Sequence, residues 1–327
     1  MDTFLQQLVN GLTAGSVYAV VALGYTMVYG IIQLINFAHG EVVMIGAMVA
    51  FTVINLLAPG GLPAVAVVLI GTSAAIPVCM LVGYALERLA YRPLRHAPRL
   101  APLITAIGLS IVLQHLALLV WSRNILAFPQ IIELRTFNVL GATVSNVQVA
   151  IVAVCTLMMA GLALLVYRTR LGTAMRATAQ NPLVAGLMGI DVNRVIAVTF
   201  IIGAALGAVA GVLFGTYYGI AQYTMGSILG LKAFSAAVLG GIGNIPGAML
   251  GGVLLGLVEA LGAGYIGEFT DLCHYGWLAA RIDACAGDGH FILFGSNYQD
   301  VFAFLVLILV LVLRPQGLLG ERVGDRA

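Results

Sequence analysis

Four ionisable side chains fall within or beside long apolar stretches of this sequence. They are His39, Glu41, Lys232 and Glu259. A charged group at the centre of a membrane costs about 2.5–3.5 kcal/mol on insertion scales, so such residues are functional candidates by default. They could line the path of a polar solute, and a self-sufficient channel or ion-coupled carrier with proton sites at Glu41, His39 or Glu259 is one hypothesis that they raise.

The residues around the first two candidates lie where the first apolar run breaks. They are Asn36, Phe37, His39, Gly40 and Glu41. A helix that starts near His39 would direct its N-terminal amides and the positive end of its dipole into the break, and Glu41 in its first turn suits that dipole. One interpretation is that these residues line a substrate path. The alternative is a capped helix start in which Glu41 pairs with backbone amides.

The other two candidates, Lys232 and Glu259, lie near the outer ends of their apolar runs. Long charged side chains at such positions can snorkel towards the interface. An ion pair between Lys232 and Glu259 is the other interpretation, and the sequence leaves both open.

The common motifs of soluble catalysis are missing from the sequence. Its single lysine, Lys232, is preceded by Leu231 and followed by Ala233, so the chain has no phosphate-binding loop of the Walker type. The zinc-protease helix motif and the serine-hydrolase elbow are missing too. We therefore expect a chain that is not an enzyme, with no cofactor and no metal.

The four cysteines do not together form a disulfide framework. Cys79 and Cys155 lie in apolar runs and are expected to be packing residues. Cys273 and Cys285 lie in a polar connection together with two histidines, at a spacing that fits no standard zinc pattern. An oxidising compartment favours a disulfide between Cys273 and Cys285; a metal site and two free thiols are the alternatives.

The longest connection rich in arginine runs from 168 to 194. In it, Asn181 followed by Pro182 can start a short helix that Gly189 would end. Such a helix is suited to docking in a groove on a partner, and the alternative is a solvated linker. The residues that would carry the docking are Arg176, Ala177, Asn181, Ala185 and Gly189.

The elements that must position these residues are membrane helices. Apolar residues make up 61% of the 327 and charged residues 9%, against roughly 25% charged in an ordinary globular protein. A helical crossing needs about 20 apolar residues. The apolar runs are continuous rather than alternating, which excludes a β-barrel. The expected crossings are residues 8–30, 40–57, 62–87, 101–120, 147–167, 195–218, 227–243, 246–264 and 301–314.

The predicted fold is therefore an all-α polytopic membrane protein with eight or nine crossings, as a single domain over 1–327. Segments 31–45 and 219–243 are interrupted by polar residues and glycine, and are expected to be broken or re-entrant. Tyr29–Gln33 resembles Tyr218–Gln222 and precedes a broken segment in both places, which indicates an inverted repeat. Glycine recurs every four residues from Gly203 to Gly219, a pattern that predicts close helix packing.

The arginines set the expected orientation. Eleven of them fall in three groups, around 88–99, 168–194 and 314–326, and positive connections stay in the cytoplasm. The connections 121–146 and 265–300 are then external. Nine crossings place the N-terminus outside and the C-terminus inside. The first 38 residues have no basic n-region, so we expect a first crossing and no cleavable signal peptide.

Three motifs spread along the chain carry a family resemblance. Residues 24–41 read GYTMVYGIIQLINFAHGE, residues 231–248 read LKAFSAAVLGGIGNIPGA, and residues 313–320 read LRPQGLLG. Together with the loop at 176–190, they resemble the permeases of branched-chain amino-acid ABC importers of the LivH type. Permeases for urea and short amides look similar, so the resemblance is less specific for the substrate.

The resemblance implies partners and a location. Such permeases pair with a second homologous permease, two cytoplasmic ATP-binding subunits and a periplasmic substrate-binding protein, within the lipid of a bacterial inner membrane and without nucleic acid. It also implies that residues 176–190 form the ATPase coupling loop and that 36–41 belong to the translocation path. Residues 268–290 depart from the family pattern as an extracytoplasmic loop insertion that contains both outer cysteines.

Overall fold

The computed structural model describes residues 2–95, 97–98, 100–139, 141–271, 273 and 298–320. The elements are, in chain order, α1 (Asp2–Ile32), α2 (His39–Leu57), η1 (Ala58–Gly60), α3 (Ala64–Ala85), η2 (Leu86–Tyr91), α4 (Leu100–Val120), β1 (Leu126–Ala127), β2 (Thr136–Val139), β3 (Ala142–Ser145), α5 (Asn146–Arg168), α6 (Arg170–Gln180), α7 (Pro182–Leu187), α8 (Val192–Tyr218), β4 (Ile220–Ala221), α9 (Met225–Gly240), α10 (Ile245–Phe269) and α12 (Gln299–Leu313).

The described helices match the predicted crossings. Seven of them are long and apolar enough to span a membrane, and α9 and α12 are shorter apolar helices of 16 and 15 residues. At 1.5 Å per residue α9 is about 24 Å long, less than the ~30 Å of a hydrocarbon core. Large apolar side chains cover the outside, as at Leu119, which is 81% exposed, and Val312, at 76%. The all-α polytopic prediction is confirmed.

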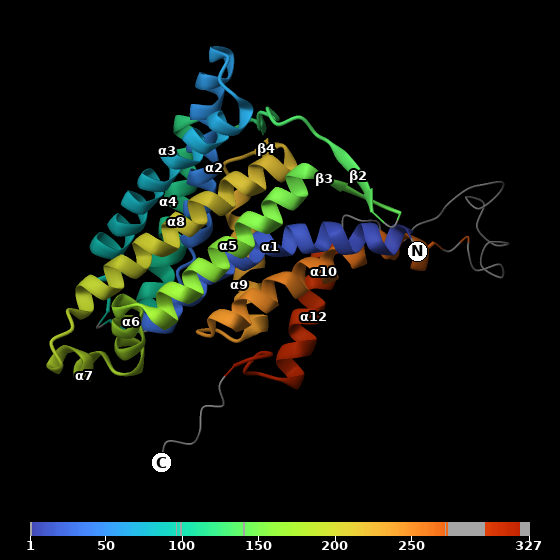
Figure 1. Ribbon diagram of the computed structural model, residues 1–327. Helices are drawn as coiled ribbons and strands as arrows, with labels where there is room; N and C mark the ends of the chain where they lie inside the picture. The colour runs from blue at the N-terminus through green and yellow to red at the C-terminus, as the bar shows by residue number, and fades with distance from the viewer. Residues whose placement is uncertain are drawn as a thin grey trace.

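Helix α1 lies in the middle of the bundle, between α5 and α8 on one side and α9 and α10 on the other (Figure 1). It packs most extensively on α10, where glycines bring the two backbones together. A Cβ atom on Gly256 would lie 2.3 Å from the Cα of Gly15, so no larger residue fits there. The predicted glycine ridge of α8 is also a packing surface, because a Cβ on Gly211 would lie 2.1 Å from the carbonyl oxygen of Val43 in α2.

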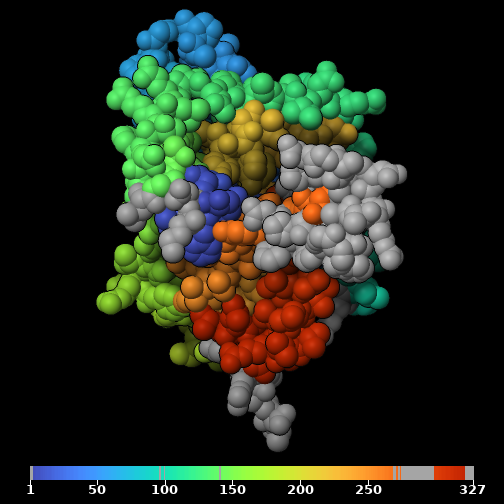
Figure 2. Space-filling view, turned by 90° about the vertical axis from the view of Figure 1, so that its right-hand side faces the viewer, coloured from blue at the N-terminus to red at the C-terminus, as the bar shows by residue number. Residues whose placement is uncertain are grey.

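Two small antiparallel sheets lie at one end of the bundle. In the first, β1 pairs with β4 in the register Leu126↔Ala221, and in the second β2 pairs with β3 in the register Thr136↔Ser145. The first sheet joins the connection after α4 to the break between α8 and α9. In Figure 2 the connection after α4 forms an upper rim in green, with the gold end of α8 recessed behind it and α12 in red below.

Helices α6 and α7, in the arginine group at 168–194 that was predicted to face inside, lie at the opposite end of the bundle (Figure 1). Arg88 in η2 and Arg92 directly after it line one cavity of about 290 Å³ together with Arg194 at the start of α8. Two arginine groups that are far apart in the sequence therefore share one end of the molecule. This arrangement agrees with the predicted topology, whose orientation in the membrane stays a prediction.

Candidate functional site

The chain is interrupted between its first two crossings, α1 and α2, at the place where the sequence predicted an interruption. Helix α1 ends at Ile32, Gln33 follows at φ 53°, a region that is uncommon for residues other than glycine, and α2 begins at His39. The backbone N–H of His39 donates to the carbonyl oxygen of Asn36 at 3.0 Å. No side chain caps α2 at its N-cap residue, Ala38, so the break is held by tertiary contacts rather than by a local cap.

Glu41 lies at the centre of a polar cluster formed by α2, α4 and α9. Its side chain is fully buried, and its Oε1 accepts hydrogen bonds from Ser110 and Gln114 at 2.9 Å each and from Ser227 at 3.1 Å. Gln114 donates to Ser227 as well. These contacts differ from the expected alternative of a carboxylate paired with backbone amides. Among the described residues, Oε2 has no hydrogen-bond partner.

His39 occupies a slot between α1 and α8. The ring lies edge-on to Tyr25 with 4.9 Å between ring centroids, and a Cβ on Gly24 would come within 2.2 Å of its Nε2. Within the described part of the chain this nitrogen has no hydrogen-bond partner. Gly24 therefore leaves the space that the imidazole of His39 occupies, and a side chain at this position would displace the ring.

The remaining three predicted path residues contact other elements. Asn36 accepts a hydrogen bond from the hydroxyl of Tyr91 at 2.9 Å, and the ring of Phe37 lies 5.6 Å from that of Phe234 in α9. A Cβ on Gly40 would lie 2.2 Å from the carbonyl oxygen of Gly226, so the starts of α2 and α9 touch. The five residues thus contact α1, α4, α8, α9 and η2, and they do not all face one side.

A second buried cluster joins α1, α9, α10 and α12. The Nζ of Lys232 lies 2.7 Å from Glu259 Oε1 and 2.7 Å from Asp300 Oδ1. The hydroxyl of Tyr18 donates to Glu259 at 3.3 Å and lies 3.4 Å from the hydroxyl of Tyr218. Because Lys232 and Glu259 are only 8% and 5% exposed, the snorkelling interpretation is wrong and the ion pair is present.

The segment between α5 and α8 folds as the sequence suggested. Asn181 caps α7 by accepting hydrogen bonds from the backbone of Leu183 at 3.0 Å and Val184 at 3.1 Å, and Gly189 follows the helix at φ 86°. Ala185 is buried against the rest of the segment, and Arg176 lies over the ring of Tyr167 at 5.7 Å. Apolar side chains of this segment are strongly exposed, namely Leu183 at 72%, Leu187 at 80% and Met188 at 79%.

Comparison with known proteins identifies the family. The family model described as branched-chain amino acid transport system / permease component matches residues 7–311. The permease protein BraD of Pseudomonas aeruginosa is 48% identical over 97% of this chain and 96% of its own length. LivH of Escherichia coli is 43% identical over the same shares. Both are named high-affinity branched-chain amino acid transport system permease proteins. No solved structure matches.

The chain belongs to the branched-chain amino-acid permease family. It is a multi-pass permease component of a transport system, and the sequence motifs at 24–41, 231–248 and 313–320 identified that family correctly. A more distant relative, the probable LivH of Methanocaldococcus jannaschii, is 27% identical over 91% of this chain and 87% of its own length.

Sequence reasoning about this permease missed most partners of its buried charges. Ser110 and Gln114 are four residues apart in α4, a spacing that places two polar groups on one face of an apolar helix and could have revealed them. Ser227 and Tyr91 carried no comparable pattern. Asp300 directly precedes the last apolar run, and an acidic residue at that place could have indicated a partner for Lys232.

Two further predictions fall mainly outside the described residues of the permease. The disulfide between Cys273 and Cys285 involves Cys285, which lies outside them, as does most of the predicted insertion at 268–290. Both stay predictions. Cys79 and Cys155 are buried free thiols, and in the described ranges no group of three or more histidine, cysteine or acidic residues could hold a metal ion.

Proposed function

We propose that this permease is the membrane-spanning subunit of an ABC importer that moves branched-chain amino acids inward. The observation that carries the proposal is the interruption between α1 and α2, with its polar residues at Asn36–Glu41, set within a chain that is 48% identical to BraD over nearly its whole length. Discontinuous helices with polar groups at their ends form the substrate sites of many transporters. An aliphatic amino acid would suit the apolar surroundings of Phe37 and Phe234.

The importer would need further subunits, because the chain has no nucleotide-binding loop of its own. We propose a second homologous permease, two cytoplasmic ATP-binding subunits and a periplasmic substrate-binding protein. The permease would lie in a bacterial inner membrane with its C-terminus in the cytoplasm. ATP binding and hydrolysis on the partners would then alternate access to the break from the two sides.

The segment around α7 is our proposed contact with the ATP-binding subunits. Its exposed Leu183, Leu187 and Met188 form an apolar surface at the arginine-rich end, on and directly after a helix whose first turn is capped by Asn181. An apolar helix in a groove is a common recognition mode between proteins. Arg176, Ala177, Ala185 and Gly189 would shape and support this coupling loop.

The test is uptake of labelled leucine, with urea as comparator, into proteoliposomes that contain the permease with its co-purified partners. ATP is placed inside the vesicles and the binding protein outside. We expect leucine uptake that requires both additions. Uptake of urea alone would keep the importer and overturn the amino-acid assignment. Uptake by this chain alone without ATP would overturn the importer and favour an ion-coupled carrier that uses the buried Glu41.

A further inference from the structure

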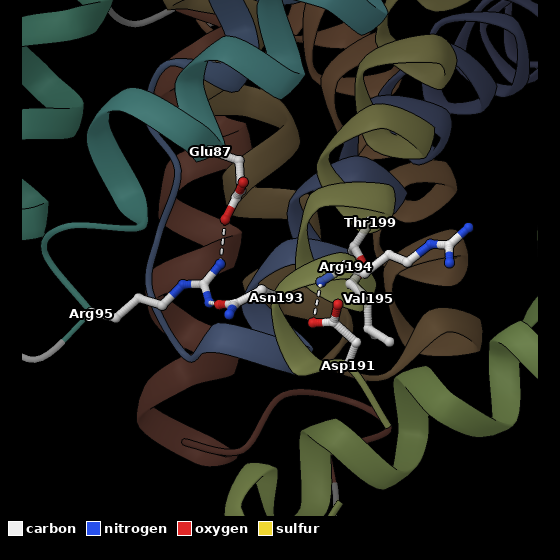
Figure 3. Close-up of polar contacts among 7 residues, drawn as sticks. All are labelled: Glu87, Arg95, Asp191, Asn193, Arg194, Val195 and Thr199. Carbon is white, nitrogen blue, oxygen red and sulfur yellow. Dashed lines mark hydrogen bonds and ion pairs between the residues drawn. The ribbon is translucent and has the colours of Figure 1, made fainter. Parts of the chain in front are cut away.

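Polar contacts begin at the first turn of α8 and cross to the end of α3. The Oδ1 of Asn193 accepts a hydrogen bond from Nη1 of Arg95 at 2.6 Å, and Nη2 of the same guanidinium donates to Oε1 of Glu87 in η2. Figure 3 shows Arg95 reaching between the two, with its guanidinium directed at both. A single side chain thus connects α8 to η2.

Helix η2 continues the connection towards the break between α1 and α2. Glu87 and Tyr91 are four residues apart in this helix, which is π-helical, a wide turn that is frequent at functional sites. The hydroxyl of Tyr91 donates to Oδ1 of Asn36 at 2.9 Å, and the carbonyl oxygen of Asn36 accepts from the backbone N–H of His39 at 3.0 Å. The contacts therefore reach the first residue of α2.

At its other end the connection is continuous with the proposed coupling loop. Asn193 follows the last residue of α7, Leu187, by only a few positions. Between them, the backbone N–H of Ile190 donates to the carbonyl oxygen of Ala185 at 3.1 Å, and Asp191 caps α8 by accepting from Arg194 N–H at 3.1 Å. These bonds make α7 and the start of α8 one unit, so a displacement of α7 displaces Asn193.

The ion pair between Arg95 and Glu87, at the centre of the connection, is largely buried. The side chain of Glu87 is 1% exposed and that of Arg95 is 15% exposed. Burial lowers the pKa of the Arg95 guanidinium, while the neighbouring Glu87 carboxylate acts in the opposite direction. A guanidinium stays charged across the physiological range. Because the Glu87 carboxylate is sheltered from water, solvent competes little for its contact with Arg95.

We propose that Arg95, Glu87 and Tyr91 are positioning residues that transmit movement of α7 to the break at Asn36 and His39. This inference rests on the proposed function, in which α7 contacts the ATP-binding subunits. The π-helical turn is the element whose shape would differ between the two access states. The two sites would then be coupled in both directions, so that substrate delivery at the break alters the ATPase.

Two mild substitutions test the two ends of the connection in the full complex. Asn193→Ala removes the acceptor of Arg95 on α8 and leaves the buried ion pair intact. Tyr91→Phe removes the hydrogen bond to Asn36 and keeps the ring, which packs against Phe200 at 5.2 Å between centroids. The matched controls are Tyr265→Phe, in α10, and Asn124→Ala, in the connection at the opposite end.

The measurement is the ratio of ATPase activity with leucine-loaded binding protein to that without it, alongside leucine uptake per ATP hydrolysed. We expect each variant to lower the ratio about five-fold, the lower end of typical coupling between sites. The controls should match the wild type. Because the contacts act in series, the double variant should be no worse than either single one. Thermal unfolding of each complex identifies any effect that comes from misfolding.

Three outcomes separate this inference from the proposed function. A wild-type complex that is not stimulated by leucine-loaded binding protein overturns the proposed function itself. A stimulated wild type whose variants match the controls overturns only the connection through Arg95 and Tyr91. Single-variant effects that multiply in the double variant also overturn it, because they would show two independent contributions rather than one series of contacts.

Discussion

The permease buries charge in two different ways. At the break, Glu41 is surrounded by hydroxyl and amide donors from Ser110, Gln114 and Ser227, and among the described residues no cation pairs with it. In the middle of α9, Lys232 is held between Glu259 and Asp300. A carboxylate among neutral donors can exchange them or lose its charge at modest cost, whereas an ion triad holds its helices in one arrangement.

The two clusters are expected to serve different purposes within one bundle. The Lys232 cluster joins α9, α10 and α12 and contacts α1 through Tyr18, so it ties four helices together at one place. The Glu41 cluster lies where α2 and α9 both begin, next to the interruptions that precede these two helices. We expect rigid behaviour from the first region and adjustable contacts from the second.

Removing the cation should produce the largest effect. In Lys232→Met, the buried Glu259 loses its partner, and breaking such pairs costs about 3–5 kcal/mol of the free energy of unfolding. Asp300 is 41% exposed and should contribute little to this loss. The thermal unfolding of the purified complex measures it. The double variant Lys232→Met with Glu259→Leu should lose less than the single one, and an equally large loss would contradict an ion-pair explanation.

Adding one methyl group at the break should have the next largest effect. In Gly40→Ala the new Cβ would overlap the carbonyl oxygen of Gly226, and overpacking of this kind costs about 1–3 kcal/mol. We expect a lower unfolding temperature and reduced leucine uptake. Gly108→Ala is the control, because nothing lies within 4 Å of a Cβ at Gly108. Equal behaviour of the two variants would show that α2 and α9 separate easily.

Changing the carboxylate tests whether the break needs a charge or only an acceptor. In Glu41→Ala, three side-chain donors lose their shared acceptor, which should cost about 1–3 kcal/mol. Glu41→Gln keeps an oxygen in the same place and should retain most of the stability and leucine uptake. A well-folded Glu41→Gln complex without uptake would show that the ionised or protonatable group itself is required.

The smallest effect should come from the edge of the ion cluster. Tyr18→Phe removes the hydroxyl that donates to Glu259 at 3.3 Å, a contact worth about 0.5–1.5 kcal/mol. Lys232 still neutralises the carboxylate, so the fold and the uptake should survive. Thermal unfolding again provides the measurement. A loss as large as that of Lys232→Met would mean that the hydroxyl, and not the cation, stabilises Glu259.

Most of the fold could be predicted because its causes are local. The positions of the apolar helices follow from continuous hydropathy over about 20 residues, and α7 follows from Asn181, Pro182 and Gly189 acting on their own neighbours. The start of α2 at His39 was readable from the polar interruption before it. The same reasoning named His39 and Glu41 as candidates, because a charge within an apolar run is unusual wherever it occurs.

The contacts of those candidates could not be predicted, because they join distant segments. Whether Glu41 meets Ser110 and Ser227 depends on how α2, α4 and α9 are rotated and shifted against each other. The long side chain of Lys232 could reach water or Glu259, and only the packing of α10 and α12 decided between them. The sequence by itself determined a membrane bundle with an interruption between its first two crossings; the tertiary structure decided which buried polar groups meet, since helix register depends on every contact at once.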